Sequence, residues 1–334
     1  MINYINIKLT LILTIGIILR IFSIYLYADP EIDNEWGIMV DNIEKHGLLS
    51  VRSIDGIPVP NIFMPPLYPI FLYLIKIFTS DLNIFLNATY FVQLILATIT
   101  ILMTYKICLE IFNKNLSYLG TFFFSIFPLN VYAVSQISSI TLQMFLINLF
   151  LLSYVKLLKN FELKSSIFFS LSSSLLILLR GEFFIFVILS LIYLHVKQRK
   201  IIKTIITALV IVLIISPYLY RNYTIFGTIT ITKSVGYNLL KGNHPRTVVG
   251  GVGMFANVES VIPETKEKLL ELYKKGPIPK HDLLKDKVLM DQAILFIKND
   301  PERYIKLYFK KFISFIFVDI NSNYPDYYSF SHIV

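Results

Sequence analysis

Long runs of apolar residues, separated by short polar stretches, fill the first two thirds of this chain. A helix needs about 20 such residues to cross a bilayer core of roughly 30 Å. The pattern predicts seven spans, at residues 9–27, 85–105, 116–134, 140–155, 165–179, 183–196 and 201–219. One further apolar run, residues 67–78, gives only about 18 Å of helix. Prolines at its start, Pro65, Pro66 and Pro69, favour a re-entrant or juxtamembrane helix there instead.

The charges of the short loops predict the orientation, because cytoplasmic loops carry an excess of lysine and arginine. With residues 67–78 left out of the count, nine cations share one side: Lys106, Lys114, Lys156, Lys159, Lys164, Lys197, Arg199, Lys200 and Lys203. The short turns on the opposite side hold only Arg180. We therefore expect the polar loop at 28–84 and the chain from 220 onward to be extracytoplasmic. Arg20 lies inside the first span, and its long side chain is expected to reach the outer interface.

Composition supports this class of protein. Of the 334 residues 55% are hydrophobic, and the mean hydropathy is +0.64, which indicates an all-α polytopic protein of the inner or plasma membrane. We expect a transmembrane domain at 1–219, with its first extracytoplasmic loop at 28–84, and a small extracytoplasmic α(+β) region at 220–334. A single cysteine, Cys108, excludes an intrachain disulfide. The net charge of +9 is spread along the loops, so no nucleic-acid partner is expected.

The C-terminal region is predicted to contain three helices and one strand. Residues 263–275 and 282–298 show helical patterns, and residues 228–232 alternate as a short strand does. A last helix begins at 300–301 and is expected to lie in the membrane interface, because cations occupy one of its faces. These cations are Arg303, Lys306 and Lys310.

The loop after the first span carries the candidate chemistry. Three acids follow that span closely: Glu31, Asp33 and Glu35. Residues 34–46 are predicted to form an amphipathic helix that ends at Gly47. Asp33 is expected to act as the N-cap of this helix, as a functional carboxylate at the membrane surface, or as both.

An arginine and an acid adjoin at an outer turn, Arg180-Gly181-Glu182. The two side chains form either a neutralised interfacial pair or a site in which Arg180 clamps a phosphate.

The order of these features resembles the C-type membrane glycosyltransferases, which use lipid-phosphate sugars and include the protein O-mannosyltransferases and the lipid A aminoarabinose transferase. The resemblance is carried by Asp33-Asn34-Glu35-Trp36, Pro65-Pro66-Leu67-Tyr68, Arg180-Gly181-Glu182, a series from Arg221-Asn222 through Gly236-Tyr237-Asn238 to Gly242-Asn243, and Ala293-Ile294 with Asp300-Pro301. Two positions depart from the family pattern. Asn34 separates two acids that members commonly hold side by side, and Met64 stands where many members have a lysine.

This resemblance implies an inverting sugar transfer from a polyprenyl-phosphate donor to a hydroxyl of a glycan, lipid or protein acceptor, at the extracytoplasmic membrane surface. It makes Asp33 the general base and Glu35 a second base candidate or a ligand of a divalent metal ion. Arg180 and Arg221 would bind the donor phosphate. Substrate-binding residues are expected at Tyr68, Glu182, Asn222, Tyr237, Asn238, Asn243 and His244.

A transporter or flippase of lipid-linked sugars is the alternative. Such a protein is expected to place charged groups near mid-membrane. The predicted spans show Ser, Thr, Asn and Gln there, with Gln143 and Asn148 the most polar, which favours the transferase.

Overall fold

The computed structural model describes residues 7–32, 34–79, 81–245, 247, 249 and 263–316. The described chain is mostly α-helical and divides into two compact units. Unit 1 consists of Met1–Val51 and Pro65–Ile231, and unit 2 of Arg52–Met64 and Thr232–Val334. The apolar runs of the sequence all belong to unit 1.

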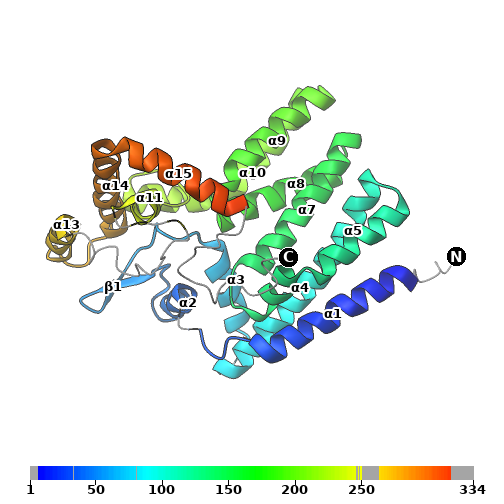
Figure 1. Cartoon of the computed structure of the whole chain (residues 1–334), viewed down its shortest axis with the longest axis horizontal. Helices are drawn as coiled ribbons and strands as arrows, with labels where there is room; N and C mark the ends of the chain where they lie inside the picture. Colours follow the sequence, from blue (N-terminus) through cyan, green and yellow to red (C-terminus); the bar gives the residue numbers. More distant parts are fainter. Residues whose placement is uncertain are drawn as a thin grey trace. The chain divides into compact units, whose positions relative to one another are not determined.

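Within the described residues, four helices of unit 1 are long and apolar enough to cross a membrane. They are α1 (Ile7–Tyr27), α4 (Leu82–Ile111), α7 (Ile140–Lys159) and α10 (Ile201–Phe226). In Figure 1, α1, α4 and α7 lie side by side with helix α5 (Lys114–Ile126). An all-α protein with membrane-spanning helices, as the sequence predicts, therefore fits the structure.

The remaining apolar runs do not all form spans of full length. The run at 116–134 is broken by a 56° bend. Before the bend lies helix α5 (Lys114–Ile126), and after it lie helix α6 (Pro128–Tyr132) and the 3₁₀ turn η1 (Ala133–Ser135). Together they are long and apolar enough for one bent span. Helices α8 (Leu163–Leu179) and α9 (Phe183–Gln198) hold 17 and 16 residues, about 25 Å at 1.5 Å per residue. The structure thus supports four or five spans, and the predicted count of seven is not confirmed.

Polar contacts connect several helix ends of unit 1. At one end, Lys159 Nζ lies 2.7 Å from Glu110 Oε2, and the Gln198 side-chain amide donates to the carbonyls of Leu157 and Leu158. Lys203 Nζ donates to the carbonyl of Phe161 at 3.5 Å. These bonds connect the ends of α4, α7 and α9 with the start of α10, close to several of the predicted cytoplasmic cations. The side of the membrane on which they lie stays a prediction.

The expected short elements of unit 1 are present. Helix α2 (Glu35–His46) ends at Gly47, whose φ of 63° is left-handed and suits glycine. Its buried positions include Met39 and Val40, as the amphipathic pattern predicts. Helix α3 (Leu67–Lys76) has 10 residues, so the prediction that this run is too short to cross a bilayer fits its length.

Unit 2 combines a hairpin with four helices among its described residues. Strands β1 (Arg52–Ile54) and β2 (Ile57–Val59) pair antiparallel through a turn at Asp55 and Gly56, both with positive φ. The helices are α11 (Val235–Asn243), α13 (Pro263–Tyr273), α14 (His281–Asn299) and α15 (Pro301–Ile316). The last three lie close to the predicted ranges, whereas α11 was not predicted. Leu240, Leu269, Leu272, Leu289 and Ala293 form their buried core.

The predicted strand at residues 228–232 is wrong. Those residues have no regular structure, and the carbonyls of Thr230 and Ile231 accept hydrogen bonds from the Asn222 amide, at 2.7 and 3.3 Å. A side chain therefore satisfies backbone groups that a strand would need a neighbouring strand to satisfy.

One buried acid fastens the hairpin segment inside unit 2. Asp282 Oδ1 lies 3.3 Å from Arg52 Nε, and its Oδ2 accepts from the Ile62 N–H at 3.4 Å. Burial raises the pKa of Asp282, and the nearby Arg52 guanidinium opposes that rise.

Candidate functional site

The segment that leads into α2 is held against the start of that helix. A Cβ at Gly37 would lie 2.0 Å from the carbonyl oxygen of Ile32, so only glycine allows the two backbones to approach this closely. Asp33, the predicted base, lies outside the described residues, and its placement stays a prediction.

The cap predicted at Asp33 belongs to Asn34 instead. Its Oδ1 accepts from the N–H groups of Trp36 at 3.0 Å and Gly37 at 3.4 Å, which satisfies two free donors of the first turn. Asn34 therefore has a structural role between the two acids. Glu35 becomes the first helical residue, exposed and at the end of the helix where the dipole favours a negative charge.

Asp29 fixes the other end of this segment. Its carboxylate accepts from the Ile137 N–H at 2.9 Å, its carbonyl accepts from the Tyr90 hydroxyl at 2.7 Å, and its own N–H donates to the carbonyl of Ser135 at 3.4 Å. The sequence analysis did not single out Asp29. An acidic residue immediately after a span could have pointed to Asp29, but Glu31, Asp33 and Glu35 follow the same span.

Two aromatic residues stabilise the approach between α2 and α3. The rings of Trp36 and Tyr68 meet edge to face with centroids 5.0 Å apart, a favourable geometry. Tyr68 is fully buried, and among the described residues its hydroxyl has no hydrogen-bond partner. In this arrangement Tyr68 supports the helix pair rather than facing solvent.

The turn between α8 and α9 carries the predicted arginine–acid pair. Arg180 Nη1 lies 3.7 Å from Glu182 Oε1, and the two side chains are 43% and 65% exposed. An ion pair with this much solvent exposure contributes little to the stability of the fold. Both side chains are accessible from solvent.

Arg221 and Asn222 differ in role. The Arg221 guanidinium lies over the rings of Tyr218 and Phe226, 5.6 and 5.4 Å from their centroids, and its Nη1 donates to Asn222 Oδ1 at 2.7 Å. Asn222 is fully buried and donates to the chain that follows α10, at Thr230 and Ile231. It therefore positions Arg221 and this chain segment, and its amide is not open to a substrate.

A single hydrophobic cluster connects these elements. Residues next to the candidate groups all pack into it: Ile32, Trp36, Tyr68, Leu179, Phe183 and Tyr218. Unit 1 thus gathers the start of α2, the start of α3, the α8–α9 turn and the final turns of α10 around one core, although up to about two hundred residues separate them in the chain.

The other predicted substrate residues belong to unit 2. The Tyr237 N–H donates to Asp286 Oδ1 at 3.0 Å, while the amides of Asn238 and Asn243 donate to carbonyls of their own helix. His244 is buried, and its carbonyl accepts from Arg303. These side chains fix α11 and its end.

Arg20 is the charged residue that the sequence analysis misplaced. It does not reach an interface: it is 1% exposed, and its Nη1 donates to the carbonyl of Ser125 at 2.8 Å and of Gly16 at 2.9 Å. Gly16 provides the room, because a Cβ there would lie 2.9 Å from Ile101 Cδ1 and 3.4 Å from Arg20 Nη1. In the sequence, only Gly16, one helical turn before Arg20, could have indicated that Arg20 packs inside the helices.

Within the described residues no group of three or more His, Cys, Asp or Glu side chains is arranged to hold a metal ion. The metal role of Glu35 stays a prediction, since Asp33 is outside that range.

No family model, curated protein or solved structure matches this chain. The resemblance to C-type glycosyltransferases therefore rests on the motifs in the sequence.

Proposed function

We propose that this protein is a membrane glycosyltransferase that moves a sugar from a polyprenyl-phosphate donor to a hydroxyl acceptor at the extracytoplasmic surface, with inversion. The observation that carries the proposal is the shared core of unit 1. It brings an exposed carboxylate, Glu35, the partly exposed Arg180 and the largely buried Arg221 onto elements that pack around one hydrophobic core. Carboxylates and cations are the two kinds of group that this reaction needs.

In the proposed reaction, Asp33 or Glu35 takes the proton of the acceptor hydroxyl. The acceptor oxygen then forms a bond to the anomeric carbon, and the bond from that carbon to the phosphate oxygen breaks. The phosphate leaves with the electron pair, so no general acid is required. Arg180 and Arg221 would offset its charge, because the planar guanidinium binds phosphate through two parallel hydrogen bonds.

The structure bears on the roles proposed for Asp33 and Glu35. Asn34 takes the cap role, so Asp33 is not needed as the cap of α2 and stays a base candidate. Glu35 keeps an exposed carboxylate at the first position of α2. Both acids therefore stay base candidates.

The test is sugar transfer by the purified protein from a panel of polyprenyl-phosphate sugars. Asp33→Asn and Glu35→Gln keep the size of each side chain but remove the base, and the variant of the true base should lose roughly 10²–10⁴ in turnover. Glu44→Gln, at an exposed acid on the same helix, is the matched control and should keep the parent rate. Full activity in both test variants would refute the assignment.

Donor binding tests the arginines separately. Arg180→Gln or Arg221→Gln should weaken binding of the donor by about 1.5–3 kcal/mol if each makes a charge-assisted contact with phosphate. The measurement is titration of a polyprenyl phosphate, with Lys45→Gln as a control at an exposed cation of α2. Equal affinity in all variants would leave Arg180 as an interfacial pair with Glu182.

A transporter of lipid-linked sugars is the second candidate, and Arg20 favours it. The sequence argument against a transporter was that the spans hold no charged group in their interior, whereas Arg20 is buried within the helices of unit 1. Reconstitution in vesicles distinguishes the two functions. Movement of the lipid-linked sugar between leaflets without transfer to an acceptor would support the transporter.

A further inference from the structure

The buried Arg20 guanidinium serves a break in the neighbouring helix. Pro128, at the start of α6, has no N–H, so the carbonyl of Phe124 four residues earlier has no helical partner. The Asn130 amide donates to that carbonyl at 3.4 Å, and Arg20 Nη1 donates to the next one, of Ser125, at 2.8 Å. Side chains thus replace the bonds lost at the bend, as a membrane interior requires.

This role uses only part of the guanidinium. Nη1 makes both of the described bonds of Arg20, while Nε is buried and has no hydrogen-bond partner among the described residues. In the same part of the chain no carboxylate forms an ion pair with Arg20. A permanently charged group without a partner is costly inside a protein or a membrane.

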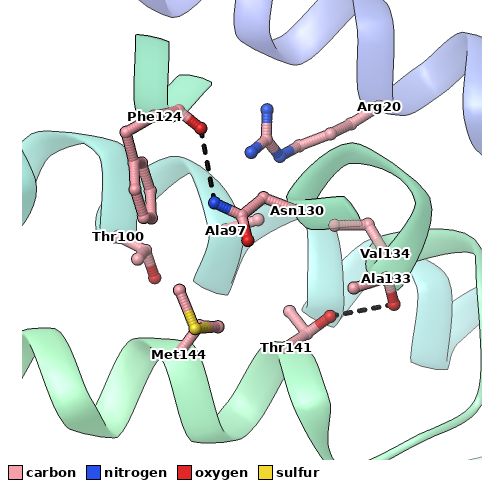
Figure 2. A pocket seen from close by; sticks show the side chains of 9 residues that line it. All are labelled: Arg20, Ala97, Thr100, Phe124, Asn130, Ala133, Val134, Thr141 and Met144. Carbon is pink, nitrogen blue, oxygen red and sulfur yellow. Dashed lines mark hydrogen bonds between the residues drawn. The ribbon is translucent and has the colours of Figure 1, made fainter. Parts of the chain in front are cut away.

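A small pocket adjoins this group. Its volume is about 20 Å³, and its lining comes from α1, α4, α5, α6, η1 and α7. Figure 2 shows Arg20 pointing toward the wall that Phe124 and Asn130 form, with Thr100, Thr141 and Met144 on the opposite side. A volume of this size holds one water molecule or one ion of similar size. No acidic residue is among the lining residues.

The first turn of α7 adds a second source of positive potential. Thr141 and Met144 bring this turn to the pocket, and Ser139, at the N-cap position, makes no side-chain bond to the free N–H groups. The N-terminus of a helix of 20 residues carries a partial positive charge. The guanidinium and the helix start therefore act on the same small volume.

We infer that the Arg20 pocket binds a monatomic anion of the chloride class. The anion would face Arg20 and the first turn of α7, and it would neutralise a charge that has no carboxylate partner in the described structure. The size of the pocket excludes phosphate, sulfate and organic anions. Bound in this way, the anion fastens α1 to the bend between α5 and α6 and to the start of α7.

The experiment measures thermal unfolding of the purified full-length protein in detergent, in sodium chloride, bromide, gluconate and sulfate at equal ionic strength. Chloride and bromide should raise the midpoint, and above half-saturation each fivefold increase in chloride should add roughly 1–2 °C. Gluconate and sulfate should not. The same midpoint in all four salts would overturn the inference and leave a pocket that holds only water.

Variants locate the effect. Arg20→Met removes the charge, and Ala97→Val fills part of the pocket without a change of charge; each should abolish the chloride-dependent rise. Lys106→Gln removes one exposed cation from α4 and should keep the full rise. If Arg20→Met does not fold, Ala97→Val decides the question together with broadening of the ³⁵Cl resonance by the parent protein. A chloride response that survives in Ala97→Val would place the anion elsewhere and refute the site.

Discussion

Asp29 gives the sharpest test of how unit 1 holds the segment that precedes α2. Asp29→Ala removes the carboxylate that accepts from the Ile137 N–H at 2.9 Å, while the backbone bonds of residue 29 to Tyr90 and Ser135 remain possible. A hydrogen bond to a charged group contributes about 1.5–3 kcal/mol. Because Asp29 is only half-buried, water can reach the freed N–H, and we expect a loss of about 1.5–2 kcal/mol.

The single tryptophan makes this loss measurable where it occurs. Trp36 packs on Tyr68 next to the segment that Asp29 fixes, so its fluorescence reports local unfolding there, while far-UV circular dichroism follows all helices. Denaturant titration of Asp29→Ala should shift the fluorescence transition to lower denaturant, ahead of the helix signal.

Two further variants give stability losses with which that of Asp29→Ala can be compared. Tyr90→Phe deletes a neutral bond to the Asp29 carbonyl and should cost about 0.5–1.5 kcal/mol. Asp41→Ala breaks an exposed pair with Lys45 at 3.4 Å and should cost less than about 0.5 kcal/mol. If Asp29→Ala is as mild as Asp41→Ala, the carboxylate does not hold the segment and the argument fails.

Three other predictions concern the described part of unit 2. Burial raises the pKa of Asp286 above its ordinary 3.8, so its contribution to stability is full below 3.8 and is lost as the pH rises through the raised value. Asp286→Asn should melt above the parent at pH 7, with the gap closing toward pH 4; a constant gap would contradict this. Gly236→Ala would place a Cβ 2.0 Å from the Asp286 carbonyl oxygen and should cost about 3 kcal/mol or more in denaturant titrations, unlike Gly120→Ala, whose Cβ meets nothing nearer than 3.5 Å. Phe309 on α15 is 58% exposed; in a Cys108→Ser background in nanodiscs, a spin label at Phe309→Cys should collide with oxygen more than with a water-soluble relaxant, and the reverse should hold at Lys310→Cys.

Local sequence pattern determined most of the helical segments of this chain, although it missed α11 and the break between α5 and α6. The apolar runs became α1, α4, α7 and α10, which begin within about three residues of the predicted starts, while α4 and α10 end about six and seven residues later than predicted. Apolar composition and length are properties of a segment alone. The amphipathic helix ending at Gly47 and the short helix of residues 67–76 followed for the same reason.

Tertiary contacts decided what individual polar side chains do. Arg20 was expected at an interface, but it donates to Ser125, 105 positions away, and nothing near Arg20 in the sequence announces a helix broken at Pro128. Asn222 looked like a substrate ligand and instead fills the backbone acceptors of an irregular segment. A polar group inside a protein must find a partner. Periodicity shows only that a side chain is buried, whereas the partner it binds depends on how distant segments pack.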